Sequence, residues 1–222
     1  GGSPYDYAHS IKQASDGGYI IAGHSSSNDG DVSFNHGDKD YWIVKLTASG
    51  EIDWQKSLGG SGPEEANSIQ QTIDGGYIIA GSSSSNDGDV TGNHGDADYW
   101  VVKLSSEGNI EWQKSLGGSG YEEACSIQQT INGGYIVAGK SSSNDGDVSA
   151  NHGGSDDMWI VKLSSSGEIE WQKSFGGYDL DQALSIQQTS DGGYIIGGET
   201  LSADGDVPEH KGGYDAWIIK LV

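Results

Sequence analysis

The chain has 222 residues, of which only 33% are hydrophobic and 37 are glycine. Its formal net charge is -22, and its 11 basic residues are all lysine. Nucleic acids and anionic membrane surfaces both need basic side chains, so this charge argues against either as a partner. No apolar run approaches the roughly 18 residues of a membrane-spanning helix, so no membrane insertion is expected.

One segment recurs four times along the chain. A tyrosine follows a Gly-Gly pair in every copy, at spacings of 58, 58 and 59 residues, and a tryptophan recurs at the same step. A period of this size indicates an array of units that bury their faces against one another. We therefore expect a single domain over residues 1–222, with repeats at approximately 1–58, 59–116, 117–175 and 176–222.

Each repeat predicts four β-strands, as the second copy illustrates in chain order. Residues 66–72 alternate small or apolar residues with polar ones, which is typical of a strand with one buried face. Asp74-Gly75-Gly76 is a tight-turn signal, because glycine adopts positive φ without penalty. Residues 77–81 are apolar on both faces and predict a central strand. After a long polar loop, residues 99–104 and 110–115 predict the third and fourth strands.

Four antiparallel strands joined by hairpins form one blade of a β-propeller, and no segment has a sustained helical period. The sequence thus predicts an all-β propeller of four four-stranded blades. The chain starts after the position of a fourth strand and stops at the close of a third, so the last blade lacks its outer strand and fifteen strands are expected. The alternatives are part of a larger propeller, or two chains that join into one eight-bladed ring. The open edge of the fourth blade also predicts self-association.

A family resemblance follows from the hairpin WVVKL-SSEG-NIEWQKS. It resembles the Leu-Asp…Gly-x-x-x-Trp pattern of quinoprotein-like propellers, whose tryptophan docks one blade on the next. The whole repeat resembles the tandem repeats of about 60 residues in bacterial and archaeal surface proteins, called delta-60-type repeats. This resemblance covers essentially the whole chain and implies a secreted propeller without an assigned activity. The quinone-binding and metal-binding residues of the quinoprotein enzymes have no counterparts here, so it implies no dehydrogenase activity.

Acidic side chains recur in the long loop of every copy. The loop carries Asn-Asp-Gly-Asp (Ala-Asp-Gly-Asp in the last copy), and a further aspartate lies two residues before the tryptophan. Close-set Asp and Asn around glycine resemble the oxygen-rich turns that hold Ca²⁺. The alternative is turn chemistry, in which these side chains bond their own backbone. The candidate calcium ligands are Asp29, Asp31, Asp40, Asp87, Asp89, Asp98, Asp145, Asp147, Asp157, Asp204, Asp206 and Asp215.

Each long loop also contains a histidine, and each link between copies contains an acid. We expect the histidines to pack within their loops, because only aspartates lie near them in the sequence and each would lie on a different blade. We expect the link acids to bond nearby glycine-rich backbone, because near-identical settings do not give the divergent pKa values that acid–base catalysis needs. The four histidines are His36, His94, His152 and His210. The four link acids are Asp6, Glu64, Glu122 and Asp181.

The aromatic residues and the single cysteine complete the prediction. The third-strand tryptophans are expected in the core and the fourth-strand tryptophans between blades. Cys125 is expected to be a tolerated free thiol, because its position varies between copies. The third-strand tryptophans are Trp42, Trp100, Trp159 and Trp217, and those of the fourth strand are Trp54, Trp112 and Trp171. The tyrosines expected at the surface are Tyr5, Tyr7, Tyr121, Tyr178 and Tyr214.

No catalytic triad, phosphate-binding loop or catalytic zinc pattern is present, so no enzyme activity and no cofactor other than Ca²⁺ are predicted. Antiparallel order places the long loops and the links on one acidic face, where a glycan or protein ligand would bind. We therefore expect a non-catalytic, extracellular or cell-surface module with a structural or adhesive role. The alternatives are a lectin-like, carbohydrate-binding propeller and, more weakly, a hydrolase with one site on the ring axis.

Overall fold

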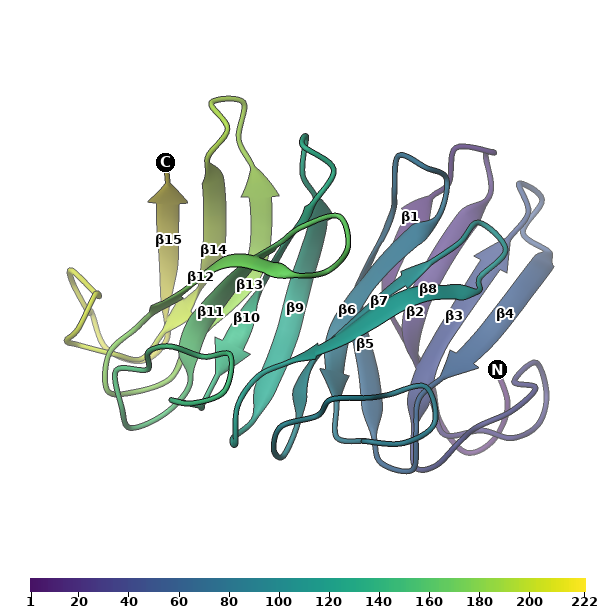
Figure 1. Ribbon diagram of the computed structural model, residues 1–222, viewed down its shortest axis with the longest axis horizontal. Helices are drawn as coiled ribbons and strands as arrows, with labels where there is room; N and C mark the ends of the chain where they lie inside the picture. The colour runs from purple at the N-terminus through teal and green to yellow at the C-terminus, as the bar shows by residue number, and fades with distance from the viewer. The chain divides into compact units, whose positions relative to one another are not determined.

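The computed structural model describes residues 1–222 and consists of β-strands without any helix (Figure 1). It therefore contains no helix able to cross a membrane.

Fifteen strands form four antiparallel sheets, as the repeat predicts. The first sheet comprises β1 (Asp6–Gln13), β2 (Tyr19–Ser25), β3 (Asp40–Leu46) and β4 (Ile52–Leu58). The second comprises β5 (Glu64–Gln71), β6 (Tyr77–Ser83), β7 (Asp98–Leu104) and β8 (Ile110–Leu116). The third comprises β9 (Glu122–Gln129), β10 (Tyr135–Ser141), β11 (Asp157–Leu163) and β12 (Ile169–Phe175). The fourth has only β13 (Asp181–Gln188), β14 (Tyr194–Thr200) and β15 (Asp215–Leu221).

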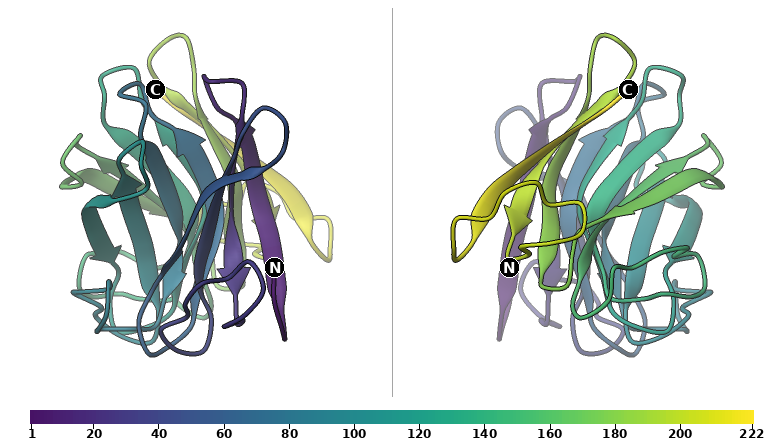
Figure 2. Two further views of the ribbon diagram at one scale, coloured as in Figure 1. Left: turned by 90° about the vertical axis from the view of Figure 1, so that its right-hand side faces the viewer. Right: turned by 90° about the vertical axis from the view of Figure 1, so that its left-hand side faces the viewer.

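The chain divides into two compact units. The first unit, residues 1–93 and 99–116, holds the first sheet and nearly all of the second. The second unit, residues 94–98 and 117–222, holds the third and fourth sheets. Within every sheet the strands follow chain order and are twisted relative to one another (Figure 2). The antiparallel all-β architecture is thus confirmed, and closure of the sheets into a propeller stays a prediction.

Equivalent strands pair in equivalent register, with two recurrent bulges. In the second sheet Ala66 lies opposite Gly81 and Ser68 opposite Ala80, so the register shifts by one residue between them. A second bulge lies where Lys103 opposes Trp112 and the next pair is Leu104 with Ile110. This bulge skips Glu111, whose carboxylate lies 2.9 Å from Lys103 Nζ. The second bulge therefore directs the Glu111 side chain to Lys103, and re-aiming a side chain is a common role of this irregularity.

The Asp-Gly-Gly turns form as the sequence predicts. Gly75 has φ of +87°, a conformation that residues with a side chain rarely adopt. The Thr72 amide donates to the Gly76 carbonyl at 2.9 Å, and the Gly75 amide donates to the Thr72 carbonyl at 2.9 Å. Asp74 Oδ1 accepts the Gly76 amide at 3.0 Å. Each residue of the motif thus has a role in closing the hairpin.

In the first unit, β5 packs across the first sheet. The Tyr41 hydroxyl donates to the Trp100 carbonyl at 2.9 Å, and the two rings lie 4.6 Å apart. Trp54 packs edge-on against Tyr77 at 5.8 Å, which agrees with the docking role expected of a fourth-strand tryptophan. Trp100 is buried, but Trp42 is partly exposed, so the expectation that it lies in the core is corrected.

In the second unit, β13 packs across the third sheet in the same way. Ile160 of β11 and Ile186 of β13 share one apolar cluster with Trp217. Trp171 packs edge-on against Tyr194 at 5.8 Å, which repeats the contact in the first unit. Each unit therefore contains one sheet-on-sheet core built from equivalent residues.

Candidate functional site

The polar residues of the repeats gather at three junctions. We define a junction by three segments: the end of one long loop, the Gly-Gly link that follows the sheet, and the end of the next central strand with its Asp-Gly-Asp turn. The first junction, in the first unit, comprises residues 36–40, 59–64 and 83–89. The second and third, in the second unit, comprise residues 94–98, 117–122 and 141–147, and residues 152–157, 176–181 and 200–206.

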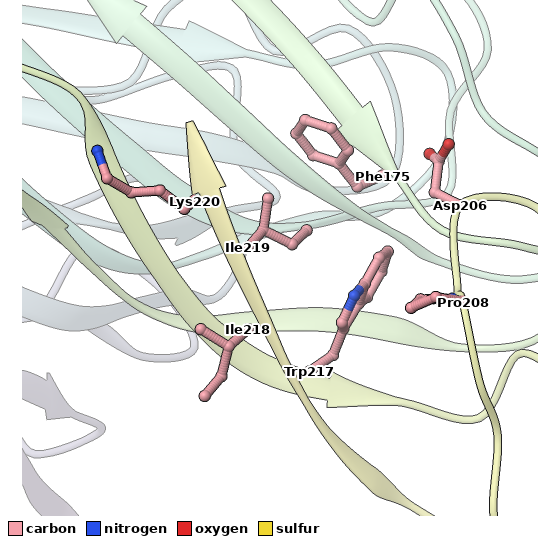
Figure 3. Close-up of a pocket in the computed structure, with 7 residues that line it drawn as sticks. All are labelled: Phe175, Asp206, Pro208, Trp217, Ile218, Ile219 and Lys220. Carbon is pink, nitrogen blue, oxygen red and sulfur yellow. The ribbon is translucent and has the colours of Figure 1, made fainter. Parts of the chain in front are cut away.

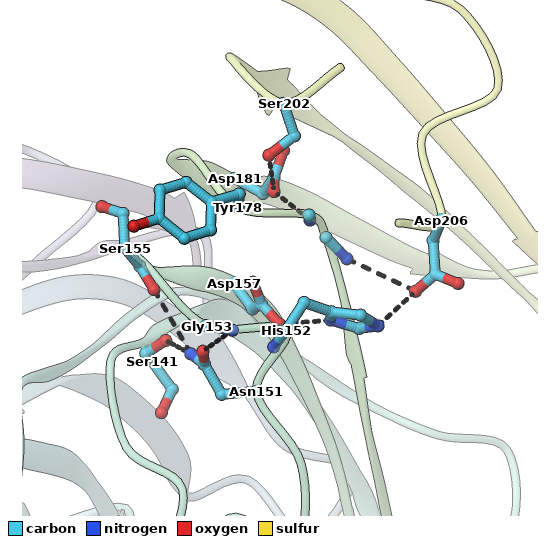
Figure 4. A network of polar contacts seen from close by, with 12 residues as sticks. Ser141, Asn151, His152, Gly153, Ser155, Asp157, Tyr178, Asp181, Ser202 and Asp206 are labelled. Atoms are coloured by element: carbon cyan, nitrogen blue, oxygen red, sulfur yellow. Dashed lines mark hydrogen bonds and ion pairs between the residues drawn. The ribbon is translucent and has the colours of Figure 1, made fainter. Parts of the chain in front are cut away.

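The Asp-Gly-Asp turn binds the link, as the third junction shows (Figure 4). The Tyr178 amide donates to Asp204 Oδ1 at 2.8 Å, and the Gly176 amide donates to Asp206 Oδ2 at 3.4 Å. In return the Asp206 amide donates to the Gly176 carbonyl at 2.8 Å. The first and second junctions repeat all three bonds. These aspartates thus satisfy backbone amides of another segment, which extends the turn chemistry expected of them.

Three of the four link acids, Glu64, Glu122 and Asp181, are buried and bonded as expected. Glu64 accepts the Gly60 amide at 2.8 Å and the Ser83 hydroxyl at 2.7 Å. Glu122 repeats this pair of bonds in the second junction. The shorter Asp181 accepts the Gly177 amide and the Ser202 hydroxyl, both at 2.8 Å. Burial raises the pKa of Glu64 above its ordinary value.

A histidine and a buried aspartate form the third part of each junction. His152 bonds Asp157 Oδ2 through its amide at 2.8 Å and through Nδ1 at 2.5 Å, and its Nε2 lies 3.2 Å from Asp206 Oδ2. The bond to Asp157 outweighs burial and holds the pKa of His152 above its ordinary value. Burial likewise raises the pKa of Asp157. The expected packing of this histidine is confirmed, and the ring also reaches the next long loop.

Two carboxyl groups flank the first glycine of each link. A Cβ atom on Gly176 would lie 2.5 Å from Asp157 Oδ1 and 2.7 Å from Asp181 Oδ2. Asp157 Oδ1 is buried without a hydrogen-bond partner. Gly59 and Gly117 have the same surroundings in the other junctions. The link must therefore have glycine at this point, for reasons of space and not of backbone conformation.

The fourth long loop departs from the other three. Asp215 accepts the Lys211 amide at 2.6 Å, and His210 Nε2 lies 3.0 Å from the Gly213 carbonyl oxygen. His210 therefore does not repeat the contact that His152 makes with Asp157. At the other end of the chain, the Ser3 amide donates to Asp29 Oδ1 at 2.6 Å, and the Gly2 amide donates to Asp6 at 2.6 Å. The link half of a junction is thus present there.

The predicted calcium ligands are all placed at these loops and links. The structure contains no group of three or more histidine, cysteine, aspartate or glutamate side chains placed to hold one metal ion. Asp87 and Asp89 bond link amides in the first junction, whereas Asp98 lies in the second junction, where it bonds His94. Calcium binding by these aspartates stays a prediction.

Sequence reasoning did not identify a histidine pair in the first sheet. His9 Nε2 lies 3.3 Å from His24 Nδ1, and burial lowers the pKa of His24. The only signal was that both positions depart from the other copies, which have Asn67 and Ser82 in the second. The two residues are adjacent only through the pairing of β1 with β2.

The exposed tyrosines and the free thiol agree with expectation. The five tyrosines are between 39% and 65% exposed. Cys125 is unpaired, and burial raises the pKa of its thiol to about 11. The thiolate is the reactive form, so this cysteine is poorly suited to act as a nucleophile.

No protein-family model matches the chain. It is 27% identical to the regulatory protein FlaEY of Caulobacter vibrioides in an alignment of 157 positions, which covers 64% of this chain and only 16% of that protein's length. A proposed exo-beta-1,3-galactanase from Bifidobacterium bifidum s17 is similar over 95% of this chain and 65% of its own, with 13% identity and a TM-score of 0.45. The tail fiber of Staphylococcus aureus phage P68 is similar over 90% and 48%, with 12% identity and a TM-score of 0.28. Neither structural likeness is strong enough to support an assignment.

Proposed function

We propose that this chain is a non-catalytic β-propeller module with a structural or adhesive role outside a microbial cell. One observation carries the proposal: Glu64, Glu122 and Asp181 are buried, and each accepts a backbone amide of its own link and a serine hydroxyl. A general acid or base must reach a proton of the substrate, and these groups are held inside the junctions. Repetition of one arrangement three times is typical of a scaffold.

The propeller part of the proposal rests on how consecutive sheets pack. In the first unit β5 packs across β1, β2 and β3, and in the second unit β13 packs across β9, β10 and β11. Equivalent contacts recur, such as the tryptophan–tyrosine pairs at 5.8 Å. Repetition of one such step about an axis generates a propeller, either of four blades or as part of a larger ring.

Calcium is the proposed stabiliser of the Asn-Asp-Gly-Asp loops, and its test is thermal unfolding. Chelator-treated chain would be heated alone, with Ca²⁺ and separately with Mg²⁺. Millimolar ion on micromolar sites should stabilise the native state by roughly 4 kcal/mol per site. Absence of a Ca²⁺-specific rise would remove calcium from the proposal and leave the scaffold role standing.

Adhesion without catalysis is tested by comparing retention with turnover. Beads coated with the chain would be passed over immobilised glycans and extracellular matrix proteins, and the same glycans would be assayed for released sugars. We expect retention without product release, and Glu122→Gln should leave retention unchanged. Product release that Glu122→Gln or Glu64→Gln abolishes would overturn the proposal, and so would the lack of any retention.

Carbohydrate binding is the second candidate, favoured by the exposed tyrosines. Tyr178 is 65% exposed at a junction where the other links have serine. An exposed aromatic ring offers an apolar face and a polar tip to a ligand. Tyr178→Ser restores the residue of the other links, so the fold should be kept. If glycan retention falls in this variant while matrix-protein retention is unchanged, the carbohydrate-binding function is supported.

A further inference from the structure

Two histidines outside the long loops lie side by side in the first sheet. His9 belongs to β1 and His24 to β2, and His9 Nε2 lies 3.3 Å from His24 Nδ1. The other four histidines of the chain are those of the long loops, so the two remaining imidazoles meet at one place. We propose that this pair binds one Zn²⁺ ion, with His9 Nε2 and His24 Nδ1 as its two protein ligands and water in the remaining positions.

The distance between the two nitrogen atoms agrees with a shared metal ion. Two nitrogen ligands that each lie about 2.0–2.1 Å from one tetrahedral Zn²⁺ ion are about 3.3–3.4 Å apart. A direct hydrogen bond usually brings its two heavy atoms to about 2.7–3.2 Å, so the observed distance is long for such a bond. The ring centroids are 5.1 Å apart, so the two rings approach each other through these nitrogen atoms. The nitrogen atoms therefore need not move apart to share an ion.

The strand pairing holds both rings in place. β2 has β1 and β3 on either side, and His24 is 8% exposed. The register of β1 shifts between Ala8 and Ser10, which places the exposed His9 at a bulge. Tyr7, opposite His24 in the ladder, packs its ring against His24 with the centroids 4.9 Å apart. Because both ligands are positioned before the ion arrives, little ordering is needed on binding, and the ion can enter from the exposed side.

The surrounding charges favour a cation at this point. Glu65 of β5 acts electrostatically on both rings and forms an ion pair with Lys39. Asp6 is a second acid that acts on His24, so the nearby charges are two negative and one positive. The net charge of the whole chain, -22, attracts cations as well. Imidazole nitrogen suits Zn²⁺ whereas Ca²⁺ takes oxygen ligands, so this site favours a different ion from the one proposed for the acidic loops.

Comparison with other parts of the chain shows that this pair is specific to the first sheet. The equivalents of His9 and His24 in the second copy are Asn67 and Ser82. A cavity of about 430 Å³ in the first unit is lined by glutamine, lysine and small residues. A cavity of about 370 Å³ beside β15 has mainly apolar walls, with Asp206 as its carboxylate (Figure 3). Neither cavity brings two imidazole or carboxylate groups together, so neither offers the ligands that the pair offers.

The test titrates the full chain, without an affinity tag, with Zn²⁺ in the presence of excess Ca²⁺. Calorimetry should give one Zn²⁺ ion per chain at the tightest site, and NMR of the imidazole rings should show the first shifts at His9 and His24. His9→Asn and His24→Ser introduce the residues of the second copy, so the fold should be kept. Each should weaken Zn²⁺ binding at least about tenfold, because even the outer-shell partners of metal ligands contribute about 10- to 100-fold. His152→Asn is the matched control and should leave the affinity unchanged.

Several outcomes would overturn the proposal. These are first shifts at the long-loop histidines, unchanged affinity in either variant of the pair, and displacement of the bound Zn²⁺ by Ca²⁺. One ion per two chains would mean that a second copy, and not water, completes the coordination, and the proposal would be wrong in that form. If His24→Ser does not fold, His9→Asn at the exposed position decides the matter. Adhesion and calcium binding are measured separately, so failure here leaves the proposed function unaffected.

Discussion

The third and fourth sheets contain almost the same third strand in different surroundings. β11 reads DMWIVKL and β15 reads DAWIIKL. All seven residues of β11 are buried, whereas in β15 only Trp217 is buried and Ile218 is 70% exposed. β11 has β12 at its side, and its Ile160 packs with Ile196 of the fourth sheet. β15 has β14 alone.

This difference shows that neighbours, and not the strand's own residues, decide burial. The alternating pattern of Trp, Ile and Lys is equally suited to both places. The polar atoms are more informative than the apolar ones, because they have specific partners. Trp159 and Lys162 both have polar partners on β12, Gln172 and Glu170 respectively.

The largest effect is expected from removing a buried tryptophan from the third sheet, which has four strands. Trp159→Ala should cost about 3–5 kcal/mol in the free energy of unfolding, because it removes a large buried ring. Trp217→Ala should cost less by at least about 1 kcal/mol, because Trp217 has no hydrogen bond to lose. Urea unfolding of both variants measures the difference. Equal costs would mean that β15 is as well covered as β11.

The next largest effect is the difference in unfolding free energy between alanine substitutions at two glycines. One lies in the link before the fourth sheet and the other in β14. Gly176→Ala should cost about 1–3 kcal/mol, because its Cβ would meet Asp157 and Asp181. Gly197→Ala is the matched control: a Cβ there meets nothing within 4 Å, and Ala138 occupies the equivalent place in β10. It should be neutral or stabilise by about 0.5–1 kcal/mol. If urea unfolding shows equal costs for the two variants, the two carboxyl groups move aside easily.

Much of the fold could be predicted because its signals are local. The period of the repeat, the Asp-Gly-Gly turns and the apolar runs are each contained within a few residues, and they predict all fifteen strands. The link acids could be predicted as well, since Glu64 and the Gly60 amide are four residues apart. The remaining strands and links could be predicted because the same signals recur in each copy.

The contacts between segments could not be predicted in the same way. Asp87 bonds the amide of Ser61, 26 residues earlier, and this pairing depends on how two loops fold together. The exposure of Trp42 and of Ile218 depends on what covers each sheet, which the repeat itself does not specify. The sequence indicated turn chemistry for the aspartates, but not which backbone they would bond.

The dependence of stability on pH should differ between the third junction, which contains His152, and the fourth long loop, which contains His210. The folded-state pKa of His152 lies above its ordinary value, so the charged histidine stabilises the protein below about pH 6.5. This stabilisation is lost as the pH rises through the folded-state pKa. Buried Asp157, whose pKa is also raised, acts in the same direction from about pH 3.9 upward. Urea unfolding from pH 6 to pH 9 measures the resulting decline.

His152→Asn should make this decline shallower. His210→Asn is the matched control, because His210 bonds the Gly213 carbonyl and does not contact Asp215 through its ring. It should keep the slope of the unmodified chain. An unchanged slope in His152→Asn would show that His152 does not carry this linkage.

The smallest expected effect concerns the ion pair between Lys162 and Glu170 in the third sheet. Glu170→Gln leaves Lys162 without its carboxylate at 3.0 Å, and because Glu170 is 43% exposed the cost should not exceed about 1 kcal/mol. Glu209→Gln is the control, since Glu209 and Lys211 are 3.9 Å apart and both largely exposed, and it should cost nothing measurable. The cost of Glu170→Gln should shrink in 1 M salt, because the pair is partly exposed to solvent. A salt-independent cost would instead assign Glu170 a packing role at the bulge.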